Sequence, residues 1–165
     1  MSLITRRMTV DDVQVAHEID RSSFTLPWPE RSFRFEVTDN PSARCWIAEL
    51  DGQVVGILIL WMIIDEAHIA TLATHPDHRR QGIAEQLLIT ALSQAYEEGA
   101  RSVLLEVRAG NEAAQALYHK YGFEAVGSRK RYYKDNNEDA VLMTLKRLSV
   151  MPVSRVEKNM KRDDQ

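Results

Sequence analysis

Residues 75–88 read HPDHRRQGIAEQLL, and this stretch decides the fold. It places Arg79, Arg80 and Gly82 at the start of a segment whose apolar residues recur at helical spacing. The first N–H groups of a helix lack backbone partners and carry a partial positive charge, so a helix N-terminus binds phosphate readily. The arginines add charge, and the glycine lets a ligand approach the backbone. These residues fit a phosphate-binding loop, and they fit a solvated basic helix cap equally well.

Two common phosphate-binding motifs are absent from the sequence. It contains no G-x-x-x-x-G-K-[ST], which excludes a Walker A loop, and no G-x-G-x-x-G, which argues against a Rossmann dinucleotide site. The net charge of −3 gives no broad footprint for nucleic acid, so we expect no direct nucleic-acid partner. The single cysteine, Cys45, excludes an internal disulfide framework and a cysteine-based zinc site.

The composition is that of one ordinary domain. The 165 residues are 44% hydrophobic and 27% charged, as in globular proteins that bury a core. The longest apolar run, residues 56–64, is far shorter than the roughly 20 residues that span a bilayer. Residues 1–8 lack the apolar core of a signal peptide. We therefore expect a cytoplasmic protein with no membrane partner.

Apolar patterns and turn signals predict an alternation of strands and helices. Asp51-Gly52 between two apolar runs predicts a β-hairpin with a type I′ turn, while Gly99 and Gly122 are stop signals for two helices. The expected helices begin near Thr9, Pro29, Ala84 and Asn111, and the expected strands span residues 3–8, 43–50, 53–64, 68–74, 102–107, 123–129 and 139–146. This order predicts a mixed α+β fold with a central sheet and helices on both faces.

Residues 79–84, RRQGIA, fit the [Q/R]-x-x-G-x-[G/A] signature, and the chain thereby resembles the GNAT superfamily of acetyl-CoA-dependent N-acetyltransferases. The segments TLATHP, LLEVR, Asn111 through Gly122-Phe123, and RKRYYKDNNEDAVLMTL are similar to that superfamily in order and spacing. The whole set is most similar to the RimI type, the ribosomal-protein N-terminal acetyltransferases. LPWPERSF resembles the Pro-Trp segment of that type, although Pro29 stands where a serine is common.

The resemblance covers about residues 3–147 and implies the GNAT fold. That fold has a central, mostly antiparallel sheet of about seven strands, with helices on both faces. We expect a single domain over residues 1–148. The tail, residues 149–165, is polar and charged, and we expect it to be flexible and outside the fold.

The same resemblance implies acetyl-CoA as co-substrate. Residues 79–84 would hold its pyrophosphate, residues 72–74 would lie along the pantetheine arm, and a backbone N–H of Leu72 or Ala73 would face the thioester carbonyl. Asn111 would also contact the cofactor, and it is a good helix N-cap at the same time. The residues expected at the cofactor are Leu72, Ala73, Thr74, Arg79, Arg80, Gln81, Gly82, Ile83, Ala84, Asn111 and Tyr118.

Glu106 is the candidate general base. It is the only charged residue in the run VLLEV, and an acid inside an apolar strand requires a reason. Strand alternation could instead turn it to solvent, or it could pair with Arg108. The resemblance favours the base, with a water molecule as an available relay. An α-amine titrates near pH 8, so a modest base is sufficient.

Tyr118 is the candidate general acid for the departing thiolate, because a phenol with a pKa near 10 can donate a proton. The residues alone also fit a packed aromatic, and the resemblance selects Tyr118 over Tyr121. Direct transfer requires no nucleophile, so Cys45 is expected in the core or on the sheet surface. No group of histidines has a metal-ligand spacing, and we expect no metal.

The acceptor site is implied by the resemblance alone. A groove for a peptide N-terminus would lie between the segment at Trp28 and the loop that holds Tyr132, Tyr133 and Glu138. Aromatic faces and carboxylates suit a cationic amine, although Glu138 and Asp139 also fit a solvated charge pair in a turn.

Three functions are compatible with these sequence features. The first is acetylation of a protein N-terminal α-amine, with the N-terminal Ala of ribosomal protein bS18 as the expected target. The second is acetylation of a lysine side chain, a polyamine or another small amine. The third is a non-catalytic acetyl-CoA-binding module. We expect a monomer, and a complex partner is left open.

Overall fold

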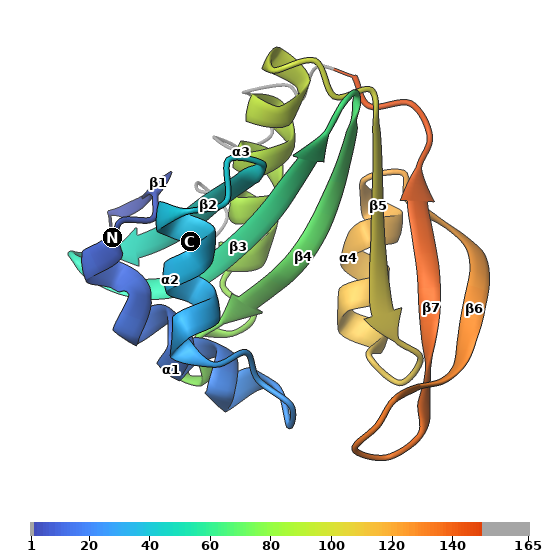
Figure 1. Cartoon of the computed structure of the whole chain (residues 1–165), viewed down its shortest axis with the longest axis horizontal. Helices are drawn as coiled ribbons and strands as arrows, with labels where there is room; N and C mark the ends of the chain where they lie inside the picture. Colours follow the sequence, from blue (N-terminus) through green and yellow to red (C-terminus); the bar gives the residue numbers. More distant parts are fainter. Residues whose placement is uncertain (1, 150–165) are drawn as a thin grey trace.

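The computed structural model describes residues 2–149. Except for Ser149, the tail expected to be flexible lies outside these residues, and the domain division at residue 148 stays a prediction. Seven strands form one sheet in the order β1-β2-β3-β4-β5-β7-β6 (Figure 1). Their bounds are Leu3–Arg7 (β1), Ala43–Leu50 (β2), Gln53–Ile63 (β3), Glu66–Thr74 (β4), Ser102–Arg108 (β5), Glu124–Tyr133 (β6) and Glu138–Leu145 (β7).

Four helices cover the two faces of this sheet. They are α1 (Val13–Ser23), α2 (Glu30–Thr38), α3 (Ile83–Glu97) and α4 (Glu112–Lys120). One core joins the sheet to α3 and α4 through residues such as Leu87 and Tyr118. The other joins it to α1 and α2 through residues such as Ile19 and Phe33. The expected α+β fold, with a mostly antiparallel sheet and helices on both faces, is therefore confirmed.

Most helices and strands begin and end close to the residues that local sequence signals predicted. Asp51 and Gly52 have φ angles of 51° and 85°, as the type I′ turn between β2 and β3 requires. The first predicted helix was wrong at its start, because residues 10–12 form a 3₁₀ turn before α1. Asp12 accepts a hydrogen bond from the Thr9 N–H at 2.7 Å, which explains the capping signal seen there. Pro29 precedes α2 as its N-cap.

The parallel pair β4–β5 interrupts the antiparallel sheet. Their pairing runs only from Glu66 opposite Ser102 to Ile69 opposite Leu105. Beyond that point the two strands diverge toward their C-terminal ends (Figure 1). The edge of β4 over residues 70–74 therefore has no neighbouring strand on the β5 side. Residues of both strands beyond this point, 70–72 and 106–108, line a cavity between them.

A β-bulge in β4 lies at the start of the divergence. The pairing with β3 skips Ala70, so this residue has no partner across the ladder. Ala70 packs against the core beside α1, and the hydroxyl of Thr71 donates to Asp20 of α1. Both side chains therefore face α1, and from Leu72 onward the alternation of the strand is reversed.

Gly56 in β3 brings the start of α3 close to the sheet. A Cβ atom there would lie 2.8 Å from Cγ2 of Ile83 and 2.9 Å from Cδ1 of Leu87. Both distances are below van der Waals contact, so only glycine fits. This glycine explains how the first turn of α3 comes to lie directly against β3.

Candidate active site

The predicted phosphate loop borders a cavity of about 470 Å³ at the N-terminus of α3, which we name the α3 cavity. Most of the residues expected at the cofactor line it. These are Leu72, Ala73, Thr74, Arg79, Arg80, Gly82, Ile83, Ala84 and Tyr118. Gln81 is not among the lining residues, and Asn111 lines a different cavity.

The backbone of the loop is shaped to present N–H groups. Arg80 and Gly82 both have left-handed conformations, with φ angles of 63° and 79°. Gly82 is also the N-cap of α3 and offers no side-chain cap, so a ligand can approach the first turn. Two exposed arginines add positive charge beside it. The residues present therefore fit the pyrophosphate of acetyl-CoA.

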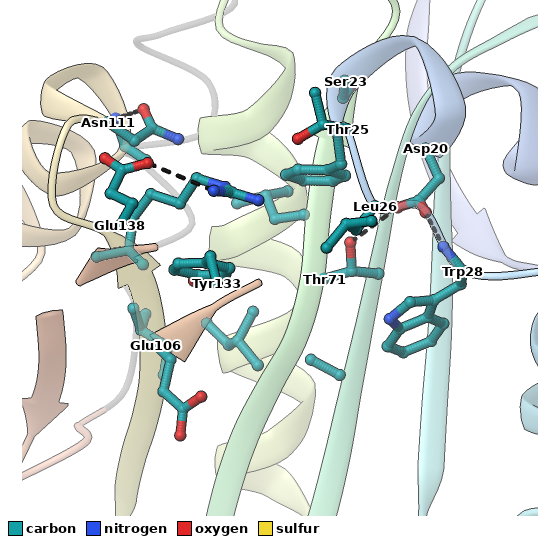
Figure 2. Close-up of a pocket in the computed structure, with 18 of the residues that line it drawn as sticks. Asp20, Ser23, Thr25, Leu26, Trp28, Thr71, Glu106, Asn111, Tyr133 and Glu138 are labelled. Atoms are coloured by element: carbon teal, nitrogen blue, oxygen red, sulfur yellow. Dashed lines mark hydrogen bonds and ion pairs between the residues drawn. The ribbon is translucent and has the colours of Figure 1, made fainter. Parts of the chain in front are cut away.

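A second cavity of about 600 Å³ opens where β4 and β5 diverge, and we name it the sheet cavity. The loop between α1 and α2, both strands, and the loop between β6 and β7 surround it (Figure 2). Leu72, Ala114 and Tyr118 line both cavities. A ligand in one cavity can therefore meet a ligand in the other at these three residues.

Glu106 of β5 lines the sheet cavity, and its side chain is 19% exposed. Its carboxylate lies 3.6 Å from a guanidinium nitrogen of Arg129. A hydrogen bond with Glu106 is the largest cause that raises the pKa of Tyr132. Figure 2 shows the carboxylate directed away from Asn111 and Glu138. Strand alternation thus turns Glu106 toward α1 and away from α3, while the polar hairpin of β6 and β7 supplies its partners.

Arg108 does not pair with Glu106. Its guanidinium bonds Asp135 at 2.9 Å and lies 3.4 Å from Glu138. It also lies over the ring of Tyr133, 3.9 Å from the centroid. The alternative that Arg108 neutralises Glu106 is therefore wrong, because the loop between β6 and β7 supplies carboxylates that bind this arginine.

Tyr118 lies at the junction of the two cavities. It is 6% exposed and packs against Phe123, with 5.4 Å between ring centroids. Burial raises the pKa of its phenol, because the phenolate would lose its hydration. The phenol is protonated at neutral pH, as that of an ordinary tyrosine is, so it has a proton to donate.

The acceptor residues expected from sequence are only partly brought together. Trp28, Tyr133 and Glu138 line the sheet cavity. Tyr132 is 40% exposed and does not line the cavity, but it contacts two residues that do, Glu106 and Tyr133. Glu138 is not a solvated charge, because it accepts the Gly110 N–H at 2.6 Å, and this bond is the main cause that lowers its pKa.

Asn111 is a helix N-cap, as its residue type suggested. Its side-chain oxygen accepts the Ala114 N–H at 3.1 Å. The side chain borders the sheet cavity and not the α3 cavity. Its predicted contact with the cofactor stays a prediction.

Two acidic residues of the sheet cavity were missed by sequence reasoning. Asp20 is 1% exposed, and burial raises the pKa of its carboxyl. The sequence pattern that could have identified it is the place of an acidic residue four positions after buried Ala16, on the apolar stripe of α1. Asp135 accepts a hydrogen bond from the Thr25 hydroxyl and so connects the two loops across the cavity. No local pattern predicts this contact, because 110 residues separate the partners.

The part of the chain that the structure describes holds neither a metal-binding cluster nor a membrane-spanning helix. Over residues 2–149, no three His, Cys, Asp or Glu side chains are grouped to hold a metal ion. None of the helices in that range is both long and apolar enough to span a bilayer. Cys45 is buried in the core, and burial raises the pKa of its thiol to about 12, which opposes a nucleophilic role.

The phosphate loop and residues of both cavities lie in a region of the chain that matches one known protein family. The profile of the acetyltransferase (GNAT) family matches residues 13–123, which include β4, the phosphate loop, Glu106 and Tyr118. The chain belongs to the GNAT family. It is therefore an N-acetyltransferase that depends on acetyl-CoA, and the α3 cavity carries the residues suited to hold this co-substrate.

Several proteins are similar over almost the whole chain. A Bacillus subtilis protein named provisionally as a [ribosomal protein bS18]-alanine N-acetyltransferase is 41% identical over 84% of this chain and 91% of its own. The crystal structure of the ribosomal-protein-S18-alanine N-acetyltransferase of Escherichia coli superposes with a TM-score of 0.83 at 28% identity, covering 92% of this chain and 97% of that one. A Bacillus anthracis acetyltransferase in complex with acetyl coenzyme A has a TM-score of 0.72 at 25% identity, covering 88% and 99%. The similarity to the RimI type is thus confirmed.

Proposed function

We propose that this acetyltransferase modifies the N-terminal α-amine of a protein, and that its target is a ribosomal protein with the N-terminus of bS18. Two relatives, one with 41% identity and one with a TM-score of 0.83, are named for the N-terminal alanine of that protein. The observation that carries the proposal is the junction of the two cavities at Tyr118, with Glu106 on the acceptor side.

The sheet cavity suits a chain end. The contact between Thr25 and Asp135 connects the two loops that border it, so an acceptor must enter end first. Four carboxylates line it, those of Asp20, Glu106, Asp135 and Glu138, against the one guanidinium of Arg108, so the lining keeps a negative character that attracts an ammonium group. Tyr133 adds an aromatic face on the same side as Glu138.

Glu106 acts as the general base in this proposal. It accepts a proton from the ammonium, directly or through one water molecule, so that the neutral amine can attack the thioester that acetyl-CoA supplies. The α-ammonium has a pKa near 8, so the transfer requires only a modest base. Arg129 and Tyr132 hold the carboxylate in one orientation.

Tyr118 acts as the general acid. It lies where the two cavities meet, the place at which a thiolate leaves. Burial that raises the pKa of the phenol also raises the proton affinity of a thiolate that leaves in the same place, so the thiolate can take the phenol proton, and solvent then restores it.

The test is steady-state acetyl transfer to a panel of amines. The panel contains peptides with free Ala, Ser or Met N-termini, one N-blocked lysine peptide and one polyamine. We expect turnover on the free N-termini, with preference for Ala. Glu106→Gln should lower kcat by about 10²- to 10⁴-fold without changing acetyl-CoA affinity. Tyr118→Phe should do the same.

Glu124→Gln, an exposed position on β6, is the matched control and should have the activity of the wild type. Turnover confined to the lysine peptide or the polyamine would refute the α-amine assignment. Acetyl-CoA binding without turnover on any amine would refute the catalytic roles of both residues.

A further inference from the structure

The segment Pro27-Trp28-Pro29, which borders the sheet cavity, has a single backbone donor. Both prolines lack an N–H group, so Trp28 alone can donate. Its N–H donates to Oδ2 of Asp20 at 2.8 Å. Its carbonyl oxygen lies 3.0 Å from Nδ1 of His17, and Nδ1 carries the proton because a carbonyl can only accept. Two side chains on α1, three residues apart, thus hold both polar groups of the Trp28 backbone.

The second oxygen of Asp20 reaches a different element. Oδ1 of Asp20 accepts the hydroxyl of Thr71 at 3.3 Å, and Thr71 belongs to the bulge of β4. Figure 2 shows Asp20 between Trp28 and Thr71 with both bonds drawn. The next residue, Leu72, lines both cavities. One carboxylate therefore joins the acceptor side of the site to the strand that continues into the cofactor side.

The surroundings leave this connection little freedom. Asp20 is 1% exposed and Thr71 is 8% exposed, so neither can exchange its partner for bulk water. The ring of Trp28 stacks on Trp61 at 6.3 Å and packs against Phe33 at 5.4 Å. The partly buried ring of Trp28 thus packs against the core, while the residue also lines the cavity.

We propose that Asp20 is a positioning residue for acetyl transfer, which through its two hydrogen bonds fixes the Pro27-Trp28-Pro29 wall relative to the β4 bulge. The proposal rests on the function proposed above. Asp20 does not contact the reacting atoms; it sets where the acceptor lies relative to the thioester. Small errors in such placement reduce the rate strongly.

The hydrogen bonds, and not the charge, carry this role. Asp20→Asn can keep both bonds, since its carbonyl oxygen can accept from Trp28 and its amide can donate to the Thr71 oxygen. Asp20→Ala removes both bonds and leaves the Trp28 N–H buried without an acceptor. Valine has the same shape as threonine, so Thr71→Val removes only the hydrogen bond between Asp20 and β4.

Kinetics of these variants test the role. With the acceptor that the wild type turns over best, Asp20→Ala should raise the acceptor KM by about tenfold or more, and Thr71→Val by about two- to tenfold, and kcat should fall in both. Asp20→Asn should restore wild-type values. The dissociation constant of acetyl-CoA should be unchanged in all three. Asp12→Asn alters another buried carboxyl on this face of the sheet, away from both cavities, and should leave KM unchanged.

Hydrogen exchange at the Trp28 amide, followed by NMR, gives a readout that does not depend on activity. It should be slow in the wild type and in Asp20→Asn, and fast in Asp20→Ala. An acceptor KM in Asp20→Asn raised as far as in Asp20→Ala would overturn the proposal, because charge would then be the requirement. So would a Trp28 amide that exchanges equally fast in all forms. If α-amine peptides are not substrates, only the proposed acceptor fails, since KM and exchange can still be compared with the amine that is used.

Discussion

Replacing Gly56 by alanine tests how closely α3 must approach the sheet. The new Cβ would lie 2.8 Å from Ile83 and 2.9 Å from Leu87, and both contacts are too short to be tolerated. Leu87 can swing its terminal methyl aside. Ile83 cannot, because the affected methyl is on a β-branched carbon and the residue is 2% exposed. The strain therefore acts on the first residue of α3.

The expected cost follows from two opposing effects. Overpacking a core by one methyl costs about 1–3 kcal/mol. Restricting the unfolded chain by replacing glycine with alanine returns about 0.4–1 kcal/mol. The net loss of about 0.5–2 kcal/mol should lower Tm by about 1–8 °C in a chain of this size. Because Ile83 also lines the α3 cavity, acetyl-CoA binding should weaken as well.

Thermal unfolding and calorimetric titration with acetyl-CoA measure the two effects. Gly127→Ala is the matched control, since its Cβ would meet Leu142 at an ordinary 3.7 Å. That variant should match the wild type in affinity, and its Tm should be equal or slightly higher, because only the gain from the restricted unfolded chain remains. If Gly56→Ala has the same Tm and the same acetyl-CoA affinity as the wild type, the close approach of α3 does not require the glycine, and the reasoning is refuted.

Three further outcomes are expected. Burial raises the pKa of Tyr118, so above pH 10 the unfolded chain releases a proton that the folded protein keeps. The free energy of unfolding therefore falls by about 1.4 kcal/mol per pH unit in that range. Urea unfolding at pH 9 and pH 11 should show a smaller loss of this free energy for Tyr118→Phe than for the wild type. Burial also raises the pKa of Asp20, so its ionisation destabilises the fold above pH 4. At pH 7, Asp20→Asn should unfold at the same urea concentration as the wild type or at a higher one. The difference between the two urea midpoints should shrink at pH 3. Arg80→Ala should weaken acetyl-CoA binding and reduce its dependence on salt, since the exposed Arg80 contributes through a screened charge.

Features set by neighbours in sequence were predictable. The Asp51-Gly52 turn depends on two adjacent φ angles, and the phosphate loop depends on a glycine at the start of an amphipathic helix. Both signals lie within a few residues. The order of strands and helices follows from such signals, which is why the fold could be expected from the sequence.

Features set by distant contacts were not predictable from the residues alone. The bond from Asp20 to Thr71 spans 51 positions, and the bond from Thr25 to Asp135 spans 110. Tyr132 was expected in the groove beside Tyr133. The ladder of β6 shifts between Arg129 and Tyr133, so residues 130–132 stand opposite Asp139 alone, and Arg131 has a φ of 53°. Such an irregularity sets which side chains face the site, and no local pattern predicts it.

The divergence of β4 and β5 opens the fold to its co-substrate, so we expect the stability of the folded protein to depend on acetyl-CoA binding. The edge of β4 over residues 70–74 has backbone groups without a neighbouring strand, and the α3 cavity lies beside it. A co-substrate that binds only the folded protein adds about 2.7 kcal/mol of stability at a concentration of 100 times its Kd. For a chain of this size, that corresponds to about 5–11 °C in Tm. The lifetime of the enzyme in a cell is therefore expected to rise and fall with the acetyl-CoA supply.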